Sequence, residues 1–212
     1  MKLRTKTERD EILTEIFKLY PTKTIELDFE TPFQLLAAVM LSAQMTDKGV
    51  NKATKKLFEI VKTPADLLEL KPEKVEVMLR GVNYYRVKTK HLFLTAEKLV
   101  HEHGGKIPHT LETIRTLPWV GVKTAKVVLS HLYDMPFIGV DTHIHRVMNR
   151  MGIVKTKTPE ETDKKLEKLL TEDQKRTMHH AIVLFWRYIC TAKKCKCSET
   201  PLAKWCGCDE CR

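Results

Sequence analysis

Two residues in the middle of the chain, Lys123 and Asp141, have side chains that suit covalent chemistry. Lys123 follows the short loop LPWVG at residues 117–121 and opens an apolar segment, and Asp141 precedes Thr142 and His143. A lysine amine can form a Schiff base with a carbonyl-like carbon. A carboxylate beside it can stabilise a developing cation or assist proton transfer. On spacing alone, a solvated lysine and an ordinary helix cap are the competing interpretations.

A second chemical feature is the cysteine-rich end of the chain. All six cysteines fall between residues 190 and 211: Cys190, Cys195, Cys197, Cys206, Cys208 and Cys211. We expect a cytoplasmic protein, because the basic start leads into a charged amphipathic segment and does not resemble a signal peptide. In that compartment, clustered cysteines favour metal binding over a disulfide framework.

Composition narrows the class of partner. The 212 residues carry a formal charge of +10 and a pI near 9.3, with an ordinary apolar content of 42%. No apolar run is long enough to cross a bilayer, so we expect no membrane association. The positive charge fits a polyanionic partner, of which nucleic acid is the commonest, although a solvated basic surface would have the same composition.

Apolar residues recur at helical spacing along nearly the whole chain, which predicts an all-α fold of many short helices. Threonine–proline pairs at residues 31–32 and 63–64 predict helix starts, and residues 7–10 resemble a capping box for the first helix. Further helices are expected over 33–42, 47–61, 87–103, 122–133, 142–151, 159–170 and 173–189. The break at residues 134–136 is a plausible domain junction.

The loop at residues 117–121 joins two of these expected helices and predicts a helix-hairpin-helix. The N–H groups at the start of its second helix have no partner within the helix, and the helix N-terminus carries partial positive charge. Such a hairpin can hold a DNA phosphate without reading the base sequence.

Several short motifs resemble, in the same order, those of the endonuclease III family within the helix-hairpin-helix DNA glycosylase superfamily. They extend from about residue 30 to Cys206. The matching segments are LSAQ at 41–44, TD at 46–47, VNKAT at 50–54, TPA at 63–65, LP at 117–118, VG at 120–121, KTA at 123–125, VDTH at 140–143, HH at 179–180 and RY at 187–188.

This resemblance implies a bifunctional DNA glycosylase and abasic-site lyase that removes oxidised pyrimidines in base excision repair. Lys123 takes the position of the nucleophile and Asp141 that of the catalytic aspartate. The implied partner is double-stranded DNA with a damaged base or abasic site, bound by a monomer. The implied fold has a six-helix domain at residues 22–134, and residues 1–21 with 135–212 form a second domain across a DNA-binding cleft.

The resemblance also implies the residues that contact DNA. Gln44 would enter the vacated base stack, and Tyr84 takes the position of an apolar wedge. The hairpin residues Pro118, Trp119, Val120 and Gly121 would approach a phosphate. Lys194, inside the cysteine loop, is a further candidate phosphate contact, although it could equally belong to a solvated charged loop.

Two positions depart from the family. Trp119 stands where the family usually has glycine, which permits φ > 0 and close approach to phosphate; the tryptophan could weaken DNA binding or add a stacking surface. In the cysteine loop, the family pattern C-x6-C-x2-C-x5-C, which holds a 4Fe–4S cluster, is matched by Cys190, Cys197 and Cys206. Thr200 takes the third position, and a hydroxyl is a poor iron ligand.

Because Thr200 replaces the third family cysteine, the sequence does not determine which cofactor the loop binds. Cys208, or alternatively Cys195, would complete a 4Fe–4S site, because each lies two residues from a matched cysteine. Zinc held by four thiolates is a second possibility, and a loop that has lost its metal is a third. For function, the alternatives are a superfamily glycosylase with another base specificity and a DNA-binding protein without catalysis.

Overall fold

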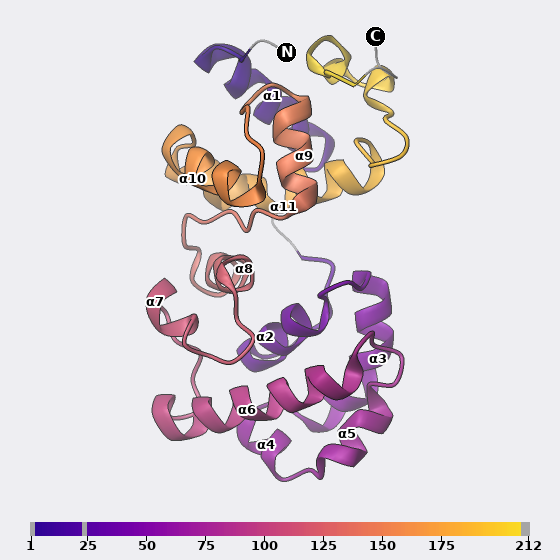
Figure 1. Cartoon of the computed structure of the whole chain (residues 1–212), viewed down its shortest axis with the longest axis vertical. Helices are drawn as coiled ribbons and strands as arrows, with labels where there is room; N and C mark the ends of the chain where they lie inside the picture. Colours follow the sequence, from indigo (N-terminus) through magenta and orange to yellow (C-terminus); the bar gives the residue numbers. More distant parts are fainter. Residues whose placement is uncertain (1–2, 23–24, 209–212) are drawn as a thin grey trace. The chain divides into compact units, whose positions relative to one another are not determined.

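The computed structural model describes residues 3–22 and 25–208, and its regular secondary structure is helical, as the sequence predicts (Figure 1). The chain divides into two compact units, one of residues 26–135 and one of residues 1–25 and 136–212. Among the described residues the β-type pairing is limited to an isolated antiparallel bridge between Cys190 and Cys195. No helix in this part of the chain is both long and apolar enough to span a membrane.

The unit of residues 26–135 is built around a buried helix, α2. Its helices are α2 (Pro32–Leu41), α3 (Asp47–Ile60), α4 (Pro64–Leu68), α5 (Pro72–Met78), α6 (Tyr85–His103), α7 (Leu111–Ile114) and α8 (Val122–Tyr133). Every α2 residue after Pro32 is buried, because α3, α6 and α8 all pack on this helix. The long helix α6 also packs on α4 and α5 (Figure 1).

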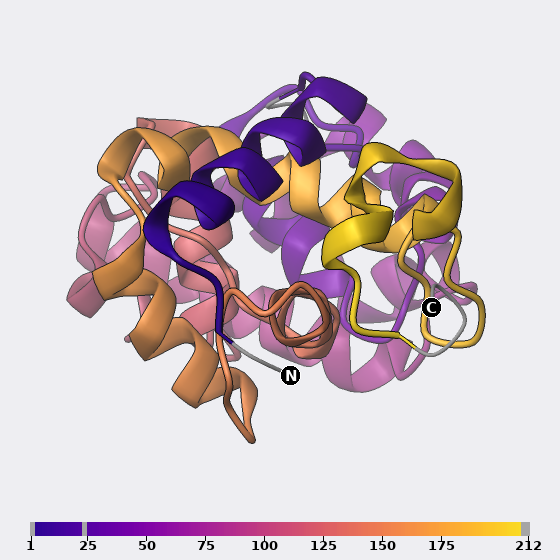
Figure 2. The same ribbon diagram turned by 90° about the horizontal axis from the view of Figure 1, so that it is seen from above.

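The other unit packs α1 and α9 against α11. Its elements are α1 (Lys6–Leu19), α9 (Thr142–Arg150), α10 (Pro159–Leu169), α11 (Glu172–Tyr188) and the 3-10 helices η1 (Cys197–Glu199) and η2 (Pro201–Trp205). The helix α1 lies along α11 and also contacts η2 in the cysteine loop (Figure 2). Ile12, Ile16 and Phe185 are fully buried in this core, which also includes Cys190 and Cys197.

Threonine side chains cap most of the helix N-termini. Thr31, Thr46 and Thr63 each accept a hydrogen bond from a backbone N–H in the first turn, as the sequence predicts for Thr31 and Thr63. One expectation is wrong: the capping box of α1 is formed by Thr5 and Glu8, not by residues 7–10. In a capping box the side chain of the residue three positions after the threonine reaches back to the N-cap N–H, and for the Thr5 cap of α1 that residue is Glu8.

Candidate nucleic-acid interface and metal centre

The loop between α7 and α8 forms a tight hairpin that leaves the start of α8 open. Val120 N–H donates to Leu117 O at 3.2 Å, which closes the turn. Gly121 is the N-cap of α8, and no side chain caps this helix. The first three N–H groups of α8 therefore have neither an intrahelical acceptor nor a cap, and they carry the partial positive charge that attracts a phosphate.

The structure separates the four predicted hairpin residues into two groups. Val120 is buried and its N–H is used inside the turn, and Pro118 is half-buried, with its carbonyl accepting from Thr95 Oγ1 at 2.9 Å. Trp119 and Gly121 are exposed. The surface that the hairpin offers to a ligand therefore consists of the Trp119 ring, Gly121 and the N–H groups that open α8.

Trp119 occupies the left-handed region of backbone conformation, with φ of 63°. Glycine adopts this conformation freely, whereas a side chain with a bulky Cβ substituent is strained in it. The position assigned to glycine by family resemblance thus has the backbone geometry that glycine favours. The indole stacks on the His91 ring of α6, with ring centroids 4.4 Å apart and planes inclined by 24°, and remains 52% exposed.

Lys123 lies in the first turn of α8, directly after the hairpin. Its side chain is exposed, and it makes no hydrogen bond or ion pair with the residues that the structure describes. A lysine engaged in a salt bridge would have to break it before attacking an electrophile. The amine of Lys123 therefore stands free beside the candidate phosphate site, as a nucleophile requires.

Gln44 and Tyr84 lie on two loops of the same unit that are tied together. Both are exposed and both have positive φ, 58° for Gln44 and 57° for Tyr84. Asn83 Nδ2 donates to Gln44 O at 2.9 Å, and Asn83 N–H donates to the Met45 sulfur at 3.4 Å. The residue expected to enter the base stack and the expected wedge are thus connected through one asparagine.

Lys88 strengthens this connection from inside the unit. It is only 4% exposed, and its ammonium donates to Leu41 O at 2.8 Å and to Ala43 O at 2.6 Å. Burial lowers the pKa of Lys88. Because Leu41 ends α2 and Lys88 lies one turn after Tyr84 on α6, this buried cation holds the Gln44 loop against the start of α6.

In the other unit, Asp141 is the N-cap of α9. Its Oδ1 accepts from His143 N at 3.0 Å and Ile144 N at 2.9 Å, whereas no described residue donates a hydrogen bond to Oδ2. The His143 ring stacks on Trp186 of α11, with centroids 3.8 Å apart and planes inclined by 7°. Asp141 is therefore a structural cap whose second oxygen remains available.

The far end of α9 holds the start of the cysteine loop. Arg146 Nη2 donates to Cys190 O at 3.2 Å. Arg150 Nη1 donates to Thr191 O at 2.7 Å and lies 3.6 Å from Cys190 Sγ. These contacts place guanidinium charge beside the first cysteine of the loop.

Five cysteine sulfurs converge in this loop, in two overlapping groups. The sulfurs of Cys190, Cys195 and Cys197 lie within 4.8 Å of one another, as do those of Cys195, Cys206 and Cys208. The Cys195 and Cys206 sulfurs are 3.6 Å apart, and those of Cys206 and Cys208 are 3.0 Å apart. Cys195 belongs to both groups, so the five thiols make one candidate metal centre.

The electrostatics of this centre favour thiolates at two of its cysteines. Hydrogen bonding from the Cys197 thiol, aided by Arg150, lowers the pKa of Cys190 to about 6. Hydrogen bonding from Cys197, with a further contribution from Cys208, lowers the pKa of Cys206 to about 4. The thiolate is the form of cysteine that binds a metal.

Thr200, Lys194 and Cys211 are the other candidate residues of the cysteine loop. Thr200 caps η2, donating its hydroxyl to Cys197 O at 2.8 Å and accepting from Leu202 N at 3.2 Å, so its oxygen is engaged with the backbone. Lys194 is exposed, and its N–H donates to Thr191 Oγ1 at 3.0 Å. Cys211 lies outside the described residues.

Comparison with known proteins identifies the family. Residues 37–172 match the HhH-GPD superfamily base excision DNA repair protein model. Endonuclease III of Escherichia coli K12 is 41% identical over 201 residues, covering 95% of both chains, and that of Thermotoga maritima is 40% identical over 197 residues, covering 93% of this chain and 91% of its own. This chain belongs to the endonuclease III family.

The solved structures agree with the family assignment. A trapped Endonuclease III–DNA covalent intermediate superposes with a TM-score of 0.92 at 36% identity, covering 99% of this chain and 98% of that chain. A thermostable thymine-DNA glycosylase, at 22% identity and a TM-score of 0.85, shares the fold. The all-helical, helix-hairpin-helix fold of an endonuclease III family member is thus confirmed.

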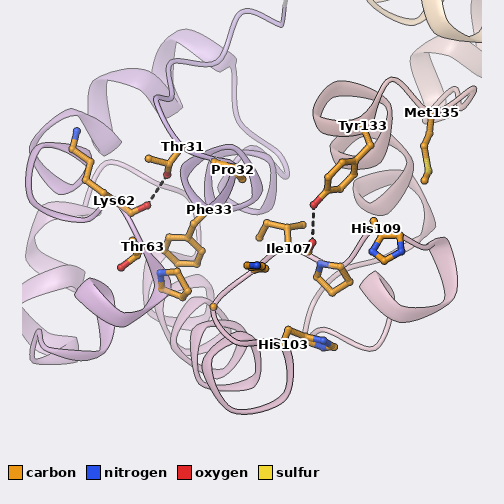
Figure 3. Close-up of a pocket in the computed structure, with 14 residues that line it drawn as sticks. Thr31, Pro32, Phe33, Lys62, Thr63, His103, Ile107, His109, Tyr133 and Met135 are labelled. Carbon is orange, nitrogen blue, oxygen red and sulfur yellow. Dashed lines mark hydrogen bonds between the residues drawn. The ribbon is translucent and has the colours of Figure 1, made fainter.

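A groove of about 960 Å³ lies in the same unit but at the opposite ends of α6 and α8 (Figure 3). His103 and Tyr133, the last residues of these helices, line it, and Tyr133 Oη donates to Ile107 O at 2.7 Å. The hairpin leads into the start of α8. The Gln44 loop follows the end of α2 and is held against the start of α6. The groove is therefore separate from the candidate nucleic-acid interface.

Three residues that shape the candidate interface were not predicted from the sequence: Asn83, Lys88 and His91. A signal for His91 was present, because Tyr84, Lys88 and His91 recur at helical spacing along the start of α6. No sequence signal marked Lys88 as buried, since it lies between Arg86 and Lys90 in a segment that looks solvated.

Substitution of Lys88 by methionine would leave Leu41 O and Ala43 O without the ammonium donor that they have inside the unit. We expect the free energy of unfolding to fall by about 1–3 kcal/mol, the cost of unsatisfied buried polar groups. Urea unfolding measures that loss, and faster amide exchange at Met45 would show that the Gln44 loop has loosened.

Lys90 supplies the matched control, because it is exposed on the same turn of α6. Lys90→Met should change the unfolding free energy by less than about 0.5 kcal/mol. Equal effects of the two substitutions on stability and on Met45 exchange would show that Lys88 does not hold the loop.

Proposed function

We propose that this chain is a base-excision-repair DNA glycosylase with abasic-site lyase activity, acting on oxidised pyrimidines in double-stranded DNA. The observation that carries the proposal is Lys123, an unpartnered amine in the first turn of the uncapped helix α8, directly after the hairpin. The similarity of the whole chain to a protein solved as a trapped covalent intermediate with DNA supports a nucleophilic role.

In this proposal, the hairpin positions the DNA, and Gln44 and Tyr84 open its base stack. The N–H groups at the start of α8 bind a backbone phosphate, which fixes the strand without reading its sequence. The damaged nucleotide must leave the helix because its sugar C1′ is inaccessible inside the base stack. Gln44 fills the vacated space and Tyr84 wedges the neighbouring step, with Asn83 and Lys88 keeping the two loops together.

The reaction then uses Lys123 as the nucleophile. The neutral amine attacks C1′, the bond from C1′ to the base breaks, and the base leaves with a proton. The bond from C1′ to the ring oxygen O4′ then breaks as that oxygen takes up a proton, which opens the sugar and leaves a Schiff base between C1′ and the lysine nitrogen. The Schiff base makes the C2′ proton acidic. Removal of this proton is followed by cleavage of the C3′–O bond and loss of the 3′ phosphate. Asp141 stabilises the positive charge on the sugar or transfers protons, through the oxygen that the helix cap leaves unused.

The cysteine centre suits an iron–sulfur cluster, since its donors are thiols alone. We propose a 4Fe–4S cluster held by Cys190, Cys197, Cys206 and a fourth cysteine, which the geometry favours as Cys195 over Cys208. Cys195 is buried and belongs to both sulfur groups, whereas Cys208 is half-buried and belongs to one. A bound cluster would supply metal–sulfur bonds that fix this loop; zinc on the same thiolates is the alternative.

Two further expectations accompany this function. We infer that the protein acts as a monomer in the cytoplasm, at the chromosomal DNA. Lys194 adds a phosphate contact from the cysteine loop, which its exposure allows.

The nucleophile is tested by borohydride trapping on a duplex with one abasic site. We expect a covalent adduct with the native chain and with Lys74→Ala, which removes an exposed lysine of α5, but none with Lys123→Ala. An adduct that persists in Lys123→Ala would move the nucleophile to another lysine. If the native chain binds this duplex without forming an adduct or cutting it, the lyase proposal fails and a DNA-binding protein without catalysis is favoured.

The role of Asp141 is tested by Asp141→Asn, because asparagine keeps the helix cap and removes the charge. We expect the rate of base release to fall by about 10²–10⁴-fold, the usual contribution of a positioned acid or base. Thermal unfolding should stay close to that of the native chain. A variant that is as active as the native chain would show that Asp141 is a cap alone.

The fourth ligand is tested by comparing Cys195→Ser with Cys208→Ser. We expect iron content and visible absorbance to be lost in the first variant and largely retained in the second, because a serine hydroxyl replaces thiolate poorly. The opposite result assigns the ligand to Cys208. Zinc in place of iron in the native chain would overturn the iron–sulfur proposal.

A further inference from the structure

The Trp119 side chain presents an open aromatic face next to the candidate phosphate site, and the hairpin itself does not require it. With φ of 63°, this position would be occupied by glycine without strain. Strained residues persist where the surrounding structure holds them, and they concentrate at functional sites. We propose that Trp119 is a stacking platform for an unpaired nucleobase of the bound DNA.

One face of the Trp119 indole is covered by a neighbouring ring, and the other face is open. The His91 ring covers one face of the indole at a centroid distance of 4.4 Å, and 52% of Trp119 remains exposed. His91 Nδ1 is buried and has no hydrogen-bond partner among the described residues. A fixed indole with one free face is the arrangement that receives a base in single-strand binding sites.

The surroundings of Trp119 extend the apolar surface toward Tyr84. Tyr84 is 70% exposed, Val87 is 46% exposed and Val122 is 39% exposed. Val87 and His91 lie four residues apart on α6, so they share a face of that helix, and Tyr84 is its N-cap. This strip, made of Tyr84, Val87, His91, Trp119 and Val122, contains no acidic side chain that would repel DNA.

The adjoining phosphate site identifies the ligand as a nucleotide. The uncapped N–H groups of α8 begin three residues after Trp119. A nucleotide whose phosphate lies on those groups has its base within reach of the indole. A paired base has both faces stacked inside the duplex, so the platform selects a base that is unpaired. This inference rests on the proposed function in one respect, that the hairpin holds DNA.

The test uses a duplex with a tetrahydrofuran abasic analogue and one unpaired 2-aminopurine, moved stepwise along either side of the analogue. At one position we expect the native chain to quench the 2-aminopurine fluorescence and to bind at least about fivefold more tightly than to the fully paired duplex. The analogue lacks the oxygen at C1′ from which a Schiff base forms. Platform binding is therefore measured independently of Lys123 chemistry, and failure of the adduct assay would leave this result standing.

Three variants distinguish stacking from a structural role. Trp119→Gly and Trp119→Ala both lack the ring and should lose the fivefold preference equally, although urea unfolding should show the alanine variant to be the less stable because it keeps the strained φ. Trp119→Phe should retain part of the preference. The platform is disproved if the binding preference for the unpaired base falls only in proportion to the loss of unfolding free energy. It is also disproved if the preference persists in both Trp119→Gly and Trp119→Ala. A dimer of the native chain that Trp119→Ala abolishes, with DNA preference unchanged, would also disprove it by assigning the strip to protein contact.

Discussion

The ammonium of Lys88 is the interaction on which the arrangement of the candidate DNA-contacting loops depends. Lys88 is buried in the unit, and its ammonium donates to Leu41 O and Ala43 O, at and just after the end of α2. Placing a lysine in the interior costs desolvation, which is why its pKa falls. The hydrogen bonds that offset this desolvation are made to Leu41 O and Ala43 O, directly before Gln44. The same burial of Lys88 that costs desolvation therefore also positions this loop.

Backbone strain in the unit of residues 26–135 also occurs at the candidate DNA-contacting loops. Among the described residues, four other than glycine have positive φ: Gln44, Tyr84, Trp119 and Asp134. Three of these are candidate DNA contacts, and the fourth ends α8. Each of the three is supported by a long-range contact: Gln44 and Tyr84 through Asn83 and Lys88, and Trp119 through His91. Strain of this kind is maintained when neighbouring packing over-determines the loop.

Local chemistry was predictable from the sequence, and long-range contacts were not. The caps Thr31 and Thr63 follow from rules that span four residues, and the family motifs placed the hairpin before Lys123. The capping box was misplaced by two residues because Thr5 and Thr7 both precede acidic residues at short range. Lys88 donates across more than forty residues of sequence, and a surface lysine and a buried one look alike in such a segment. The convergence of Cys195 with the other thiols likewise depends on how the loop folds back, which spacing does not determine.

In the function that we propose, the structural role and the chemical role of Asp141 do not compete. The two N–H groups of α9 that bind Oδ1 hold the carboxylate in one orientation, and they lie at the positive end of the helix. A carboxylate that is already fixed suits the stabilisation of a sugar cation, because no reorganisation is needed when the charge develops. In the function that we propose, the cap therefore also orients Asp141 for chemistry, and Oδ2 is the atom through which it would act.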